Sequence, residues 1–182
     1  MSKSLKTIQV LAKIGMIISK VMFILSVVCG IACFVALTAL LGVQELRLGG
    51  TDMIEWFMKE SGATIEESYY SCVSGVIVCI AQAILCKFSW RYFTNELSAG
   101  TPFTMEGAKE VLRLGILIIV IPCVTLVLQE IVASIMLPGV ADVVTEELSE
   151  LGYGVMFIVC SVFFRYGAEL ESGEKSEKNA GI

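Results

Sequence analysis

The residues of this 182-residue chain whose types could support chemistry are seven cysteines and one isolated acid, Glu130. The cysteines lie in or near apolar runs and none forms a loop CxxC pair: Cys29, Cys33, Cys72, Cys79, Cys86, Cys123 and Cys160. Three of them share a helical stripe with Gly75 and Ala83, which favours close helix packing. Cys29 and Cys33 lie one helical turn apart, but no histidine exists to complete a metal site with them. We therefore expect no metal and no cofactor.

The absence of histidine also bears on catalysis, because histidine is the commonest general base. Serine, cysteine and paired-acid motifs placed for a protected cleft are missing, and so is a glycine-rich phosphate loop. The pair Gly152 and Gly154 is better explained by helix packing. We expect no catalytic residues and predict that the protein is not an enzyme.

Glu130 is the one acid inside an apolar segment, and such carboxylates are candidates for handling ions or protons. Arg113 should lie at the inner membrane surface, and the 17 residues of helix between them cover about 26 Å. That distance places Glu130 near the outer headgroups. The sequence leaves open whether Glu130 is a functional carboxylate or an ordinary interfacial acid. Pro122 should kink the same helix, as in transporters, although proline is common in membrane helices.

The elements that position these residues are long apolar segments. Hydrophobic residues make up 56% of the chain, charged residues 17%, and the mean hydropathy is +0.81, which is typical of a membrane protein. Apolar runs occupy residues 21–43, 68–86, 114–137 and 151–164, of which the last is short. The first run is longer than a signal h-region and no clean A-x-A site closes it.

We therefore predict an all-α fold, an integral membrane bundle of four transmembrane helices. The helices are expected at about residues 14–43, 68–97, 105–137 and 146–170. They form a single domain, residues 1–171, and residues 172–182 are predicted to be a disordered cytoplasmic tail.

Basic residues are distributed unequally among the connecting segments. Four lysines precede the first run, four basic residues lie in 87–113 and three follow Phe164, whereas 44–67 has two and 138–150 none. The positive-inside rule therefore places both termini in the cytoplasm. Direct binding to nucleic acid is not expected, because the eleven inner basic residues are spread over three segments and partly mixed with acids.

Segment 87–113 is the most informative polar stretch. The second helix should extend past the membrane, with Trp90 and Phe93 on one stripe. Gly100 suits a helix end, and Thr104 caps the next helix. The segment either positions two helices or docks a cytoplasmic partner. Candidate docking residues are Trp90, Phe93, Thr101, Pro102, Phe103, Thr104, Arg113 and Arg165.

Two further patterns concern the first outer loop. Residues Thr64 to Glu67 form a capping-box pattern before the second helix. Residues Asp52 to Glu60 are compatible with a short helix that lies on the outer leaflet or packs on the bundle as a lid.

The residues Asn95 to Glu106, followed by Leu112 to Gly115, resemble the signature G-T-P-F-T-x-E then L-R-x-I/L-G of domain of unknown function 2975. Phe164 to Leu170 resembles the closing F-R-x-G-x-x-L element of that family. The family consists of small multi-pass bacterial membrane proteins. The resemblance implies a four-helix architecture and a location in the bacterial cytoplasmic membrane. It supplies no catalytic residues, and the chain departs from the family pattern at 171–182.

Some relatives in that family are encoded beside small Cro/CI-type DNA-binding regulators, which implies a class of partner. The favoured hypothesis is thus a membrane-anchored regulatory protein that docks a cytoplasmic protein through segment 87–113. The alternative is a small transporter, efflux or toxin-protection protein, which would form a homo-oligomer because four helices enclose little space. A purely structural role in the membrane fits the sequence equally well.

Overall fold

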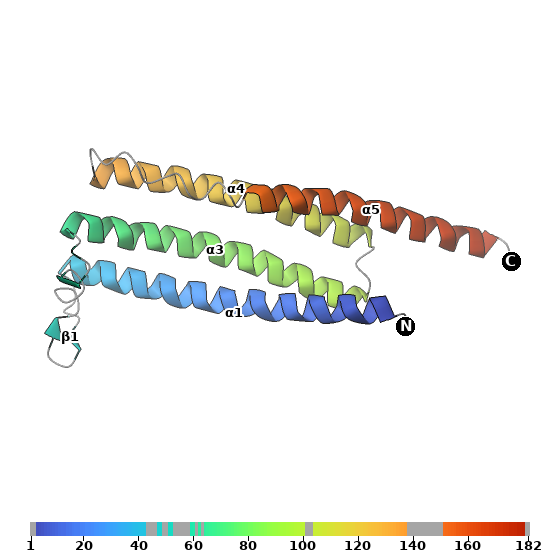
Figure 1. Ribbon diagram of the computed structural model, residues 1–182, viewed down its shortest axis with the longest axis horizontal. Coiled ribbons are helices and arrows are strands. Elements are labelled where there is room, and N and C mark those ends of the chain that lie inside the picture. Colours follow the sequence, from blue (N-terminus) through green and yellow to red (C-terminus); the bar gives the residue numbers. More distant parts are fainter. Residues whose placement is uncertain are drawn as a thin grey trace. The chain divides into compact units, whose positions relative to one another are not determined.

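The computed structural model describes residues 3–42, 47–48, 51–52, 59–60, 62, 64–100, 104–137 and 151–180, with side chains placed within residues 6–42, 59–60, 62, 64–100, 104–137 and 152–170. The helices with stated bounds are α1 (Lys3–Leu40), α3 (Ile65–Ala99), α4 (Met105–Met136) and α5 (Leu151–Ala180), labelled in Figure 1. The strands β1 (Arg47–Leu48) and β2 (Thr51–Asp52) pair antiparallel, with Arg47 opposite Asp52.

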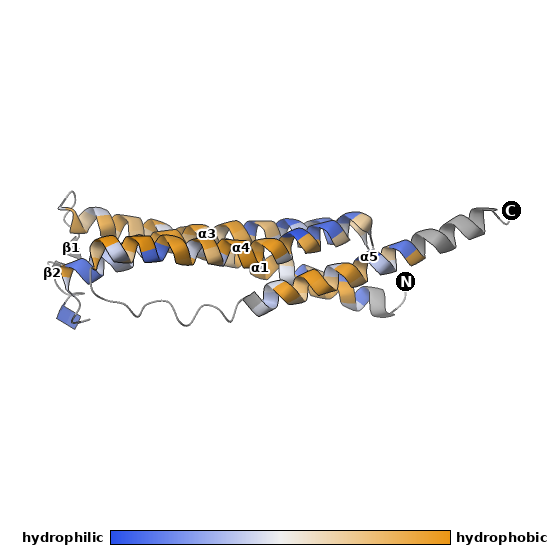
Figure 2. Cartoon of the chain, turned by 90° about the horizontal axis from the view of Figure 1, so that it is seen from above, coloured by the Kyte–Doolittle hydropathy of each residue, from blue (hydrophilic) through white to orange (hydrophobic). Residues whose placement is uncertain are grey.

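All four helices contain a stretch long and apolar enough to cross a membrane. The described parts of these helices are Lys6–Leu40, Ile65–Ala99, Met105–Met136 and Gly152–Leu170. Each contains an apolar window of 18 residues, and the window of the fourth helix is the least apolar. No more than 28% of the residues in any of the four apolar windows are buried. Hydrophobic colouring accordingly follows α1, α3 and α4 for most of their length in Figure 2. The predicted all-α class with four apolar helices is confirmed, and the chain is compatible with a multi-pass membrane protein.

The helix bounds differ from the predicted ones at several places. α1 begins at Lys3 rather than near residue 14, because no proline or glycine precedes Gly15 to interrupt it. The predicted start of the fourth helix, residues 146–150, lies outside the described residues. In the first loop Asp52 belongs to β2 instead of a helix, Lys59 and Glu60 are helical, and 53–58 lie outside the described residues.

The largest difference is at the C-terminal end, where α5 continues to Ala180 through a segment predicted to be disordered. Extension of an existing helix avoids the cost of nucleation. A polar composition alone was therefore an insufficient reason to predict disorder.

The chain divides into two compact units, where the sequence predicted one domain. Unit 1 comprises Met1–Phe23, Ile84–Pro122 and Glu147–Ile182, and unit 2 comprises Ile24–Ala83 and Cys123–Glu146. α1, α3 and α4 contribute to both units, because helices of 32 to 38 residues are long enough to join two packing neighbourhoods.

In unit 2, α1 and α3 approach closely through small residues. A Cβ atom on Gly75 would lie 2.9 Å from the Cys33 Sγ atom, and one on Gly30 would lie 3.2 Å from the Cys79 Cβ atom. The Tyr69 hydroxyl donates a hydrogen bond of 2.7 Å to the Leu40 carbonyl. The packing role expected of Gly75 and Cys79 is thereby confirmed.

The core of unit 1 consists of buried Tyr92, Val111 and Leu114. Partly buried residues pack around it: Phe88, Phe93, Phe157, Cys160 and Phe164. α4 and α5 cross where Gly115 faces Gly154, and a Cβ on either glycine would lie 3.0 Å from the carbonyl oxygen of the other. Gly154 thus has the packing role expected from the sequence, whereas a Cβ on Gly152 would have nothing within 4 Å.

Candidate functional site

The connection between α3 and α4 is built from local hydrogen bonds at its two ends. Gly100 has φ of 74°, and its amide donates to the Glu96 carbonyl at 3.1 Å, which ends α3. The Gly107 amide donates to the Thr104 side-chain oxygen at 2.9 Å, which caps α4. The predicted helix end and cap are confirmed. The intervening candidates Thr101, Pro102 and Phe103 lie outside the described residues.

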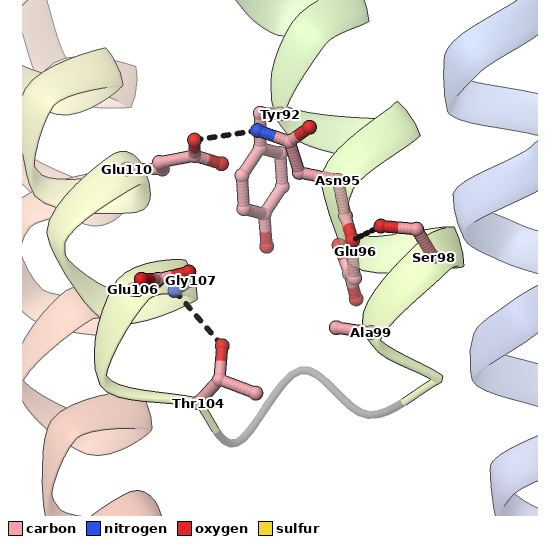
Figure 3. A pocket seen from close by; sticks show the side chains of 9 residues that line it. All are labelled: Tyr92, Asn95, Glu96, Ser98, Ala99, Thr104, Glu106, Gly107 and Glu110. Carbon is pink, nitrogen blue, oxygen red and sulfur yellow. Dashed lines mark hydrogen bonds between the residues drawn. The ribbon is translucent and has the colours of Figure 1, made fainter.

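A cavity of about 260 Å³ lies between these two helix ends in unit 1. α3 contributes five of the lining residues and α4 three (Figure 3). The nine lining residues are Tyr92, Asn95, Glu96, Ser98, Ala99, Thr104, Glu106, Gly107 and Glu110. Three of these carry carboxylates and none is basic, so the cavity has a negative character. We name it the acidic hairpin cavity.

Tyr92 forms the apolar base of the acidic hairpin cavity. The residue is 6% exposed and belongs to the buried cluster with Val111 and Leu114. Its hydroxyl points into the cavity in Figure 3. The Tyr92 ring also packs at 5.2 Å, centroid to centroid, against the tilted ring of Phe93. The packing of unit 1 therefore fixes the position of the phenol that the cavity contains.

Glu96 lies beside that hydroxyl, ten residues beyond the uncharged run 68–86. Burial raises the pKa of the Glu96 carboxyl above its usual range, and a hydrogen bond with Tyr92 acts in the opposite direction. Burial, followed by the charge of Glu96, raises the pKa of the Tyr92 hydroxyl. The phenol consequently remains protonated near neutral pH and acts as a donor toward the carboxylate.

The other two carboxylates come from successive turns of α4. The Asn95 side-chain amide donates a hydrogen bond of 2.6 Å to the Glu110 carboxylate across the cavity. The backbone carbonyl of Asn95 accepts a separate hydrogen bond of 2.7 Å from the Ser98 hydroxyl. Glu106 lies in the first turn of α4, near the positive end of the helix dipole. The arrangement presents preoriented acceptors that a cation can bind.

A smaller cavity of about 50 Å³ adjoins this site and shares Tyr92 and Glu110 with it. Its lining includes Arg91 and Arg113. The Arg113 guanidinium carbon lies 5.0 Å from the Phe88 ring centroid, within the range of a cation–π contact. Glu110 therefore lies at the boundary between the acidic hairpin cavity and a neighbouring cavity whose lining includes two arginines.

The remaining predicted docking residues lie in different surroundings. Phe93 packs against α1, where its ring atoms approach Gly15 so closely that a Cβ there would lie 2.7 Å away. The Lys20 ammonium lies 5.7 Å from the Trp90 ring centroid. Arg165 forms an exposed ion pair of 3.0 Å with Glu169 on α5. Of the candidates that the structure describes, Thr104 lines the acidic hairpin cavity, whereas Trp90 and Phe93 contact α1.

Sequence reasoning did not select the residues that define the acidic hairpin cavity, namely Tyr92, Asn95, Glu96, Glu106 and Glu110. A signal was present, because Tyr92 and Glu96, and likewise Glu106 and Glu110, lie four residues apart on either side of a capped turn. Residues at that spacing share a helix face. What the spacing did not show was that the two faces meet.

Glu130, the other predicted site residue, is exposed on α4 in unit 2. Its neighbour Gln129 donates a hydrogen bond of 2.7 Å to the Ser74 hydroxyl on α3. Pro122 lies inside α4 and is buried. Within the described ranges, no group of three or more cysteine or acidic residues is placed to hold a metal ion.

Comparisons with protein-family models, with curated proteins and with solved structures each returned no match.

Proposed function

We propose that this chain is a multi-pass protein of the bacterial cytoplasmic membrane that anchors a cytoplasmic protein partner. Four apolar helices support the membrane location. The excess of lysine and arginine in the segments before α1, between α3 and α4, and after Phe164 supports cytoplasmic termini and a cytoplasmic α3–α4 connection. The bacterial membrane follows from the resemblance to domain of unknown function 2975.

The observation that carries the proposal is the acidic hairpin cavity. Its three carboxylates have no basic residue among the lining side chains. A lysine or arginine side chain of a partner would supply the missing charge, and arginine also offers several donors in a fixed geometry. The site accordingly fits a protein with a basic surface.

A small DNA-binding regulator has such a surface, because it must neutralise phosphates. A basic side chain held in the acidic hairpin cavity is unavailable to DNA. Docking would therefore keep the regulator at the membrane and compete with its binding to DNA. This mechanism requires no catalysis by the chain.

Photocrosslinking in intact cells tests the proposal. A photoreactive residue at Ala99, which is exposed and lines the cavity, should capture a basic cytoplasmic protein. Adding Glu106→Gln and Glu110→Gln should reduce the yield of that adduct at least tenfold, because both changes remove charge and preserve size. Adding Glu130→Gln instead is the matched control and should leave the yield unchanged.

Two results would contradict the proposal. One is the absence of any protein adduct from Ala99 while the protein is present at normal levels in the membrane. The other is an adduct whose yield does not respond to the two cavity substitutions.

A further inference from the structure

α1 has one packed face and one exposed apolar face within unit 1. The packed face holds Ala12 and Ser19, both buried, together with Gly15, which receives the ring of Phe93. On the other side, six aliphatic residues are between 47% and 62% exposed: Val10, Leu11, Ile14, Ile17, Ile18 and Val21. We name these six residues the α1 aliphatic stripe.

Lipid can cover only part of the α1 aliphatic stripe. α1 has 38 residues, which is about 57 Å of helix, whereas the hydrocarbon layer is about 30 Å thick. Lys20 is the last charged residue before the uncharged run 21–43, and its exposed side chain marks the boundary of the hydrocarbon layer. The stripe begins ten residues earlier, about 15 Å outside that boundary. Its outer residues thus need a protein surface to cover them.

The spacing of the residues in the α1 aliphatic stripe is suited to packing against a second copy of α1. Val10, Ile14, Ile17 and Val21 alternate at intervals of four and three residues, which is the pattern of the seam of a coiled coil. The sequence repeats this spacing at Ile24, Val28 and Ile31, and each of these residues is exposed as well. A soluble partner reaches only the segment outside the membrane. A second copy of the chain, inserted in the same orientation, presents the same pattern in parallel along the whole run.

The lysines of α1 are compatible with this arrangement. Lys6, Lys13 and Lys20 are exposed and recur every seven residues beside the seam. In a parallel pair they occupy g positions and face e positions of the other helix. The e positions that follow Lys6 and Lys13 hold Leu11 and Ile18, so the stems of these two lysines lie on aliphatic side chains of the second copy. Lys20 instead contacts the Trp90 ring of its own chain.

The area of the stripe reaches the lower limit for a specific interface. A half-exposed leucine, isoleucine or valine contributes roughly 100 Å² of accessible surface, so the stripe offers about 600 Å² on each copy. Two copies together bury at most about 1,200 Å² through the stripe itself, which is the lower end of the range for specific interfaces. The residues beyond Val21 add to this area.

We propose that a second copy of this chain packs in parallel against the α1 aliphatic stripe. The pairing is independent of the partner proposed for the acidic hairpin cavity. It gives each membrane dimer two such cavities.

The test uses the full chain in its native membrane, with a photoreactive residue at Ile14. The expected product is an adduct at twice the mass of the chain. The control carries the same photoreactive residue at Tyr153 on α5, which is 64% exposed, and should give at least tenfold less of that product. Combining the Ile14 probe with Ile17→Glu should reduce the adduct at least tenfold, and Ile17→Ala should reduce it severalfold while preserving the helix.

A second measurement is copurification of two differently tagged copies, which Ile17→Glu should abolish. Four results would overturn the proposal: adducts from Ile14 with lipid alone, adducts with a different protein alone, equal self-adducts from Ile14 and Tyr153, or a self-adduct that Ile17→Glu leaves intact.

Discussion

The crossing of α4 and α5 supports the sharpest quantitative prediction, which compares Gly154→Ala with Gly152→Ala. A Cβ on Gly154 would meet the Ile119 side chain and would lie 3.0 Å from the Gly115 carbonyl oxygen. The isoleucine can change rotamer, but the backbone oxygen cannot move without moving α4. The two helices must therefore separate, and overpacking of this kind costs about 1–3 kcal/mol.

Gly152→Ala is the matched control, because a Cβ at that position would have nothing within 4 Å. Both substitutions gain the same kind of benefit from replacing glycine by alanine in a helix, at most about 1 kcal/mol. The difference between the two variants consequently isolates the packing cost. We expect Gly154→Ala to be less stable than Gly152→Ala by about 1–3 kcal/mol in free energy of unfolding.

The assay is denaturant unfolding of each purified variant in the same detergent, followed by circular dichroism. The slope of free energy against denaturant must be equal for the two variants for the comparison to hold. Equal stability of the two variants, or a more stable Gly154→Ala, would refute the inferred close crossing. The crossing also bears on function, because Gly115 follows Leu114, which supports Tyr92 at the base of the acidic hairpin cavity.

Three further predictions concern single side chains. Glu96→Gln should stabilise the protein near neutral pH and flatten the dependence of its stability on pH. Because the pKa of Glu96 is raised, the folded state binds this proton more tightly than the unfolded chain does. Stability of the native protein therefore falls as pH rises from the ordinary pKa of glutamate to the raised one. Unfolding titrations between pH 4 and pH 8 measure this, and an unchanged curve would contradict it. Thr104→Ala should lower the free energy of unfolding by about 1 kcal/mol, because it removes the α4 cap. Thr104→Ser keeps a hydroxyl at this position and should retain most of that stability in the same denaturant unfolding assay. Tyr69→Phe should cost about 0.5–1.5 kcal/mol, because the Leu40 carbonyl loses its bond from the phenol; no change in unfolding midpoint would argue against that bond.

Much of the fold follows from properties that act locally along the chain. The four apolar helices were predicted from run length, and the ends at Gly100 and Thr104 were predicted from their residue types. The capping box is also confirmed: the Glu67 amide donates to the Thr64 side chain at 3.2 Å, and the Thr64 amide donates to the Glu67 carboxylate at 2.7 Å. These features depend on neighbours within four residues, which the sequence places unambiguously.

The candidate site was less predictable because it depends on which helix faces meet. Trp90 and Phe93 were selected as aromatic residues of a polar segment, and both contact α1, while Phe93 also packs against the cluster that contains Tyr92. Tyr92 has the same composition-based description, yet it is buried against Val111 and Leu114 of α4. The difference between adjacent aromatic residues arises from a rotation of 100° per residue about the helix axis. Which aromatic side chain of α3 is buried depends on whether α1 or α4 packs against its side of the helix, and the local sequence does not contain that information.

The distribution of charge along the α3–α4 segment gives the acidic hairpin cavity an orientation in the proposed membrane topology. On α3, Lys87 and Arg91 precede Glu96. On α4, Arg113 follows Glu106 and Glu110. The charges nearest the membrane are therefore basic on both helices. Anionic lipids of the inner leaflet attract the basic residues and repel the carboxylates. In the proposed topology this field would hold the cavity toward the cytoplasm. A basic partner of the proposed kind would be attracted to the same anionic membrane surface and would meet the carboxylates first. The field that orients the hairpin would then also raise the local concentration of the partner.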